Sequence, residues 1–133
     1  MIHGVDHVGV AVEDLDAARR VWDALLAETP RVETVPSQKV RAAMYPCRVE
    51  LLAATAPDSP IARFLAKRGP GLHHVTLRVT GIDGELARLK AAGVPLVNET
   101  PVRGAEGARV AFLHPSAAGG VLVELKEAAH GGP

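Results

Sequence analysis

The 133-residue sequence lacks features that define several common classes of protein. Its single cysteine, Cys47, cannot form an internal disulfide, so stability must come from packing. Basic and acidic side chains number 15 each, with no basic tail or stripe, which argues against a nucleic-acid partner. No apolar run approaches the length of a membrane span, and Met1–Asp6 leads into a strand pattern rather than a targeting peptide. We therefore expect a cytoplasmic protein with no nucleic-acid or membrane partner.

A repeat within the chain predicts its fold. Asp6–Asp16 aligns without a gap with His73–Asp83, and each segment reads as a strand followed by a turn and a helix start. Asp14 or Asp16 is expected to cap a helix that runs to about Ala27. Asp83 is expected to cap its counterpart, which ends at Gly93. Apolar residues at helical spacing mark both helices, namely Ala18, Val21 and Leu25 in the first and Leu86 and Leu89 in the second.

Three strand-like runs follow each predicted helix, so each half reads as βαβββ. In the first half they are residues 32–36, 40–45 and 48–53; in the second they are residues 97–101, 109–113 and 120–126. Between the halves, Asp58 or Ser59 is expected to cap a short helix over residues 59–67, which Gly69-Pro70-Gly71 ends. We predict one α+β domain over residues 1–133, with pseudo-symmetric modules at about 1–55 and 72–127 and a linking helix at about 56–71.

Polar residues occupy equivalent places in the two halves. His7 and His74 lie in the two first strands, and Glu50 and Glu124 lie in the two last strands. Register with His7 favours His74 over its neighbour His73. A symmetric pair of modules would bring these four residues to one central cavity. Two imidazoles and two carboxylates form a divalent transition-metal site, and a cation offsets the cost of burying the carboxylates.

Alternation along the strands supports this arrangement. Val8, Val10 and Val12 are expected to pack under the first helix. The opposite face, with His7, Gly9 and Ala11, carries small residues that leave room for a ligand. Singly, each polar residue also has an ordinary interpretation as a hydrogen-bonded or solvent-facing strand residue.

The sequence resembles the methylmalonyl-CoA epimerase family of the vicinal-oxygen-chelate superfamily over nearly its full length. The resemblance rests on His7-Val8-Gly9-Val10-Ala11-Val12, Asp58-Ser59-Pro60-Ile61-Ala62, Gly71-Leu72-His73-His74-Val75, Phe112-Leu113-His114-Pro115 and Gly119-Gly120-Val121-Leu122-Val123-Glu124-Leu125. The first and last of these motifs are shared across the superfamily, and the others are more specific. The resemblance implies a half-open, barrel-like mixed sheet around a metal cavity.

The resemblance also implies a chemistry. The family's metal ligands fall on His7, Glu50, His74 and Glu124, and Glu124 is the implied catalytic residue. Cobalt is the first expectation for the metal, with Mn, Ni and Zn possible. The implied reaction converts methylmalonyl-CoA between its 2R and 2S forms, by removal and return of the C2 proton through a metal-stabilised enolate. An acyl-CoA substrate and a homodimer follow from the same resemblance.

The sequence departs from part of the family at Ala42, where some members carry a second glutamate as the opposite-face base. His114 and Glu33 are weak substitutes for it. Arg63, Lys67 and Arg68 either meet CoA phosphates or form a solvated helix face.

Other functions remain open at this point. One is a lactoylglutathione lyase, which the Asp-Ser-Pro-Ile-Ala segment and the short insertion argue against. A non-haem iron dioxygenase would leave one acidic residue unexplained. A non-catalytic small-molecule-binding member would tend to lack the four ligands.

Overall fold

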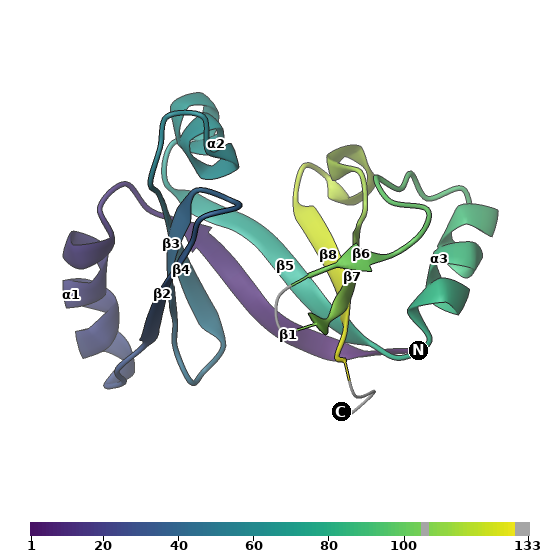
Figure 1. Ribbon diagram of the computed structural model, residues 1–133, viewed down its shortest axis with the longest axis horizontal. Coiled ribbons are helices and arrows are strands. Elements are labelled where there is room, and N and C mark those ends of the chain that lie inside the picture. Colours follow the sequence, from purple (N-terminus) through teal and green to yellow (C-terminus); the bar gives the residue numbers. More distant parts are fainter. Residues whose placement is uncertain (105–106, 130–133) are drawn as a thin grey trace. The chain divides into compact units, whose positions relative to one another are not determined.

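The computed structural model describes residues 1–104 and 107–129 (Figure 1). The chain divides into two compact units, one formed by Val8–His73 and the other by Met1–His7 together with His74–Pro133. We call them the inner unit and the outer unit, after their order along the chain. The division falls within two strands, β1 (Ile2–Ala11) and β5 (Gly71–Val79).

The inner unit carries four strands in the order β2-β3-β4-β1. Its remaining elements are β2 (Arg31–Val35), β3 (Val40–Met44), β4 (Val49–Ala54), α1 (Leu15–Leu26) and α2 (Pro60–Arg68). The pairs β2–β3 and β3–β4 are antiparallel, whereas β4 runs parallel to β1. The return from β1 to a parallel neighbour requires a crossover, which α1 supplies.

Helix α1 begins at an aspartate cap, as predicted. The Asp14 carboxylate accepts a hydrogen bond from the Ala17 backbone N–H at 3.1 Å. The helix packs through Leu15, Ala18, Trp22 and Leu26 onto a core that includes Val10, Val12, Tyr45 and Leu51. The predicted packing of Val10 and Val12 beneath the helix is therefore confirmed. The predicted helix face is wrong in part, because Val21 and Leu25 are 65% and 67% exposed.

Helix α2 covers the opposite face of the inner strands. Ser59, fully buried, caps it by accepting from the Ile61 N–H at 3.1 Å, and Pro60 occupies its first turn. Its apolar side chains Ile61, Phe64 and Leu65 pack against Ala11, Val40, Ala42 and Leu52. The expectation that this face leaves room for a ligand is therefore wrong at Ala11, where α2 fills the space.

The outer unit repeats the same topology. Its strands β6 (Val102–Arg103), β7 (Arg109–Phe112), β8 (Leu122–Glu127) and β5 lie in the order β6-β7-β8-β5, which matches β2-β3-β4-β1. Again the last strand runs parallel to the first, and the other pairs are antiparallel. Helix α3 (Ile82–Ala91) packs its buried Ile82 and Leu86 on Val79, Ala111 and Leu125. The α+β class and the internal pseudo-symmetry are confirmed at the level of topology.

Residues 97–101 do not form the predicted strand of the second half. The prolines that flank this segment, Pro95 and Pro101, do not account for the difference, because β2 in the first half forms between Pro30 and Pro36. The Asn98 side chain takes the place of a ladder bond, since its Oδ1 accepts from the Phe112 N–H at 2.9 Å. Pairing here is limited to an isolated bridge between Leu96 and Leu113, and the ladder starts at the short strand β6.

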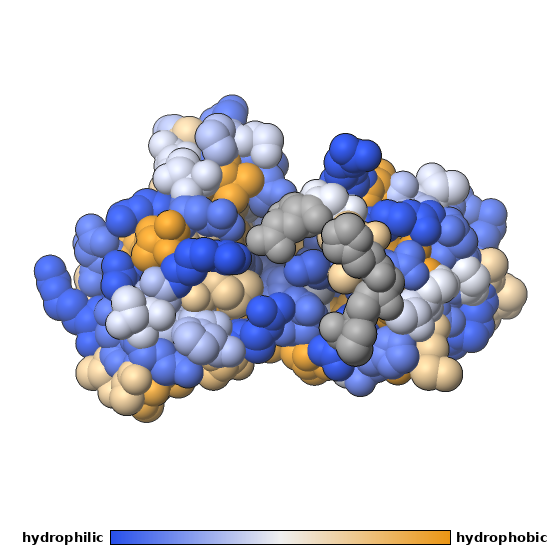
Figure 2. All heavy atoms as spheres, turned by 60° about the horizontal axis from the view of Figure 1, so that its bottom comes forward, coloured by the Kyte–Doolittle hydropathy of each residue, from blue (hydrophilic) through white to orange (hydrophobic). Residues whose placement is uncertain are grey.

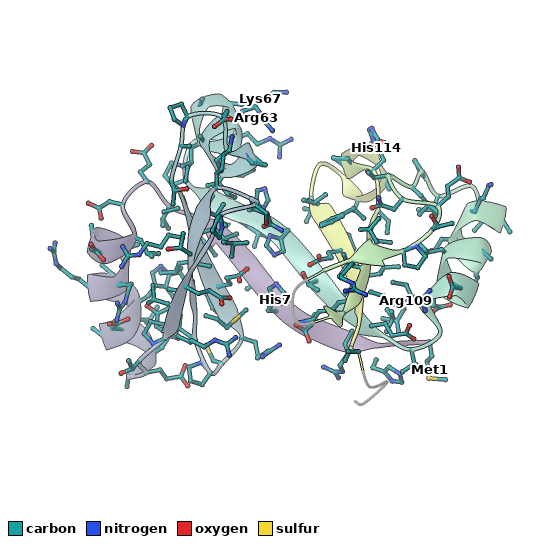
Figure 3. The ribbon with its side chains drawn as sticks, viewed as in Figure 1. Met1, His7, Arg63, Lys67, Arg109 and His114 are labelled. Atoms are coloured by element: carbon teal, nitrogen blue, oxygen red, sulfur yellow. The ribbon has the colours of Figure 1, made fainter. Side chains whose placement is uncertain are left out.

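The predicted start of α3 is also wrong. The cap residue is Gly81, in a left-handed conformation, and it makes no side-chain capping bond. Asp83 lies inside the first turn, where a carboxylate favours the helix dipole, and its Oδ2 accepts from Arg109 at 2.6 Å (Figure 3). The loop before β8 contains a short 3₁₀ helix, η2 (Pro115–Ala118), that the sequence did not predict.

Hydrophilic residues cover much of the face shown in Figure 2, with apolar side chains in small groups. None of the helices within residues 1–104 and 107–129 is long and apolar enough to span a membrane.

Candidate metal centre

Two histidines meet in the outer unit. His7 lies on β1, and His74 lies on β5 beside it (Figure 3 labels His7). Their Nε2 atoms are 3.2 Å apart, and the rings meet edge to face with centroids 5.3 Å apart. Both residues are buried, at 7% and 9% exposure. Each imidazole therefore offers a nitrogen to a common point in a space that is shielded from water.

Thr76 connects Glu124 to His7. The parallel pairing of β5 with β8 places Thr76 opposite Glu124. The Thr76 hydroxyl donates to Glu124 Oε1 at 2.7 Å, and the hydroxyl oxygen, Thr76 Oγ1, lies 3.2 Å from His7 Nε2. Thr76 has no exposed surface, so its geometry is fixed by packing. Within the outer unit, His7 and His74 thus meet directly, and Thr76 links Glu124 to His7.

The fourth predicted ligand, Glu50, belongs to the inner unit. It lies on β4, where the parallel register pairs it with Gly9 of β1. Its neighbours Val49 and Leu51 both pack in the core beneath α1. Because side chains alternate along a strand, the Glu50 side chain leaves β4 on the face away from α1.

His73 has a different environment from His74. Its ring packs edge to face on the Phe64 ring, with centroids 4.9 Å apart. Burial lowers the pKa of His73, which favours a neutral imidazole. Of the two adjacent histidines, His74 is therefore the one that lies beside His7, as register predicted.

The weaker catalytic candidates lie elsewhere. His114 caps η2, where its Nδ1 accepts from the Ser116 N–H at 3.2 Å. Glu33 is exposed on β2, opposite Ala42 in the register. Ala42 itself is 3% exposed and packs against α2. A residue at position 42 therefore lies under α2 in this chain.

The basic residues predicted on α2 have local partners. Arg63 donates to the Asp58 carbonyl oxygen at 2.8 Å, and the Arg68 guanidinium lies 5.9 Å from the centre of the Phe64 ring. Arg63 and Lys67 project from the same helix (Figure 3). A role in binding phosphates stays a prediction.

The donor set of the outer unit fits a divalent transition metal. Imidazole suits Zn, Co, Ni and related ions, and a carboxylate adds charge and a hard oxygen. Two nitrogens and one carboxylate leave coordination positions for another ligand or for a substrate. Without a cation, the two imidazole nitrogens would face each other at 3.2 Å with one shared hydrogen at most.

Two site residues escaped the sequence interpretation. Asp6 Oδ2 lies 2.8 Å from His7 Nδ1, and Thr76 holds Glu124. The adjacency of Asp6 to a candidate ligand was visible in the sequence, as was the even spacing of Thr76 from His74. The contact of Thr76 with Glu124 was not visible, because it depends on how β5 and β8 pair.

Comparison with known proteins identifies the family of the chain. The sequence profile described as the Glyoxalase/Bleomycin resistance protein/Dioxygenase superfamily matches residues 6–112. The bovine mitochondrial methylmalonyl-CoA epimerase is 40% identical, over 93% of this chain and 74% of its own. The ethylmalonyl-CoA/methylmalonyl-CoA epimerase of Cereibacter sphaeroides is 37% identical, over 96% of this chain and 99% of its own. The crystal structure of the Mycobacterium tuberculosis methylmalonyl-CoA epimerase superposes with a TM-score of 0.85 at 40% identity, covering 96% of this chain and 89% of that one.

The profile match spans most of the chain and defines its class as this superfamily. Within it, the chain belongs to the methylmalonyl-CoA epimerase family.

Proposed function

We propose that the chain is a divalent-metal-dependent epimerase that interconverts the 2R and 2S forms of methylmalonyl-CoA. The observation that carries the proposal is the contact between the buried His7 and His74, to which Thr76 links Glu124. Two relatives that align over nearly the whole chain are named as methylmalonyl-CoA epimerases, which supports the proposal.

We propose His7, His74, Glu50 and Glu124 as the metal ligands. Glu50 is included because it is the equivalent of Glu124 in the other half of the repeat. Its pairing with Gly9 supports this: Gly9 follows His7 by two residues in the same strand, and such residues share a face. When bound, the cation supplies Lewis-acid stabilisation of the negative charge that develops on the thioester oxygen.

Glu124 is proposed to move the proton. The C2 hydrogen of the substrate lies between a carboxylate and a thioester, so its removal leaves an electron pair that delocalises into the thioester carbonyl. Because Thr76 donates to Oε1 of Glu124, the other oxygen, Oε2, is left to take this proton. Return of a proton to the opposite face of C2 completes the epimerisation.

The second proton-transfer group is not supplied by position 42. Ala42 has no ionisable group and is packed beneath α2. The proposal therefore assigns one protein base, Glu124, with water or a second side chain delivering the proton on the other face. Because the proton on the other face comes from water or from a second side chain, each conversion is expected to bring one label from solvent into C2.

The test is to strip the protein with chelator, add back Co, Mn, Ni or Zn singly, and incubate it with one epimer in deuterated water. NMR follows both epimer conversion and deuterium entry at C2. We expect metal-dependent conversion, with cobalt the most effective, and a loss of about 100-fold or more in Glu124→Gln. Glu99→Gln is the matched control, because it makes the same chemical change in the same unit at an exposed residue that pairs with Lys90.

Absence of conversion with every metal, for both methylmalonyl-CoA and ethylmalonyl-CoA, would refute the proposed substrate class. The methylglyoxal–glutathione adduct would then test the lyase activity. No turnover of that adduct would leave a binding protein of the same superfamily.

We further propose that the protein is a cytoplasmic homodimer, as the family resemblance implies. Size-exclusion chromatography with light scattering should give twice the mass of the chain. Cell fractionation should recover the protein with soluble cytoplasmic enzymes.

A further inference from the structure

We infer that Asp6 is a positioning residue of the metal centre: its carboxylate sets the His7 ring so that Nε2, and not Nδ1, is the ligand atom. The inference rests on the proposed metal site and adds a residue to it. All the contacts that carry it lie within the outer unit.

The first step is the assignment of the His7 tautomer. Asp6 Oδ2 lies 2.8 Å from His7 Nδ1, and a carboxylate oxygen accepts a hydrogen bond, so Nδ1 carries the hydrogen. In a neutral imidazole this leaves the lone pair on Nε2. That is the atom 3.2 Å from His74 Nε2, on the side of the ring that faces the other ligands.

The second step uses the single hydroxyl hydrogen of Thr76. Thr76 Oγ1 lies 3.2 Å from His7 Nε2 and 2.7 Å from Glu124 Oε1. The shorter contact is to an oxygen that accepts, so the hydroxyl hydrogen goes to Glu124. The His7 Nε2 lone pair is therefore not used by Thr76 and points to the space between the two imidazoles.

The third step concerns what holds Asp6. Lys126 Nζ lies 3.6 Å from the same Oδ2 atom that contacts His7. Lys126 follows Glu124 by two residues on β8, so one strand supplies both a proposed ligand and the cation beside Asp6. The Asp6 and Lys126 side chains are 11% and 26% exposed, and the His7 side chain is 9% exposed. Lys126 therefore holds Asp6, and Asp6 orients the His7 ring through Nδ1, the nitrogen that does not face His74.

A carboxylate behind a metal-bound histidine fixes ring orientation and raises the basicity of the ligand nitrogen. Loss of such a partner generally costs about 10–100-fold in metal affinity. The cost arises because His7 would then sample the other tautomer and other ring rotations. Metal binding would have to reverse both.

The experiment compares Asp6→Ala and Asp6→Asn with the unmodified chain. Asn keeps an oxygen that accepts from Nδ1 but has no charge, whereas Ala removes the acceptor. Asp83→Asn is the matched control, since Asp83 is also paired with a cation in the outer unit but lies in α3 and contacts none of the proposed ligands. Long-range ¹H–¹⁵N NMR of the metal-free proteins reports the His7 tautomer, and competition with a chromophoric chelator gives the Co²⁺ affinity.

We expect the Nδ1–H tautomer of His7 in the unmodified protein, in Asp6→Asn and in Asp83→Asn, and a mixture of tautomers in Asp6→Ala. Co²⁺ affinity should fall about 10–100-fold in Asp6→Ala, less in Asp6→Asn, and not in Asp83→Asn. An Nε2–H tautomer in the unmodified protein would overturn the inference without any variant. Unchanged Co²⁺ affinity in a folded Asp6→Ala protein would also overturn it. Failure of the unmodified protein to bind any divalent metal would instead count against the proposed function, and the tautomer measurement would still stand alone.

Discussion

At the scale of single residues, Tyr45 shows how one buried polar group is satisfied. Its side chain has no exposed surface, and its hydroxyl donates to Asp23 Oδ1 at 2.6 Å. Arg19 donates to the other oxygen of Asp23 at 3.2 Å. Burial and the adjacent Asp23 carboxylate raise the pKa of Tyr45 to about 12, and the Tyr45 hydrogen bond lowers the pKa of Asp23. The contact ties α1 to the end of β3.

This raised pKa predicts an alkaline loss of stability. Tyr45 holds its proton more tightly in the folded state, so its contribution is complete below its ordinary pKa of 10.0 and is lost as pH rises towards about 12. We expect the free energy of unfolding to fall across that range in the unmodified protein and to change less in Tyr45→Phe. Urea unfolding at several pH values measures both. Because the chain has one tyrosine, tyrosinate absorbance reports the group directly. Ionisation near pH 10 in the folded protein would contradict the prediction.

Thr76 carries a second residue-scale prediction. Thr76→Val keeps the shape of the side chain but removes the hydrogen that Glu124 Oε1 accepts. We expect the free energy of unfolding of the metal-free protein to fall by about 1–3 kcal/mol, the cost of a lost bond to a charged group. Thr76→Ser keeps the hydroxyl and should lose less. Denaturant unfolding tests the pair, and equal losses would show that packing rather than the hydroxyl dominates.

Residue roles were predictable from the sequence where the repeat made them visible. His7 and His74 were matched by alignment, and the structure brings them together. Thr76 was not predicted, because nothing local to it reveals that β5 and β8 pair in the register Thr76 to Glu124. Asp6 was not predicted, because neighbouring side chains on a strand normally point to opposite faces. A polar side chain acquires its role here from a strand about 50 residues away, with a separation of 48 for Thr76 and Glu124.

At the scale of elements, α1 shows the limit of reading helix faces from apolar spacing. Val21 and Leu25 are four residues apart, as are Trp22 and Leu26, so spacing alone supports two faces. The structure buries the second face, together with Leu15 and Ala18. The choice depends on which side of the inner strands the helix reaches, and the helix sequence does not contain that information. The strand expected at residues 97–101 is replaced by a bond from the Phe112 backbone to the Asn98 side chain, which the likeness of this segment to residues 32–36 gave no reason to expect.

The α1 face gives an element-scale prediction. Leu15→Ala opens a cavity in the core, since Leu15 is 3% exposed, and should lower the free energy of unfolding by about 2–5 kcal/mol. Leu25→Ala makes the same chemical change at a site that is 67% exposed and should stay within about 0.5 kcal/mol. Thermal or denaturant unfolding of both variants checks the contrast. Comparable losses would mean that the Val21–Leu25 face is covered in solution.

At the scale of the whole molecule, the proposed metal should stabilise the folded chain. The ligands come from residues far apart in sequence, so the unfolded chain offers no preformed site. Metal at 100 times its dissociation constant should add about 2.7 kcal/mol to the free energy of unfolding. Unfolding with and without chelator measures this, and His74→Ala should abolish the difference. An equal effect of metal on His74→Ala would place the bound metal elsewhere.

The outer unit is built from two separate segments of the chain, which affects how the chain folds during synthesis. Met1 contacts Thr80 and His7 contacts His74, at separations of 79 and 67 residues, whereas the inner unit is one continuous segment. The first seven residues leave the ribosome well before their partners, so they must wait unpaired while Val8–His73 can already condense. Such distant pairings slow folding. His7 is therefore made 67 residues before its neighbour His74 and must wait for it.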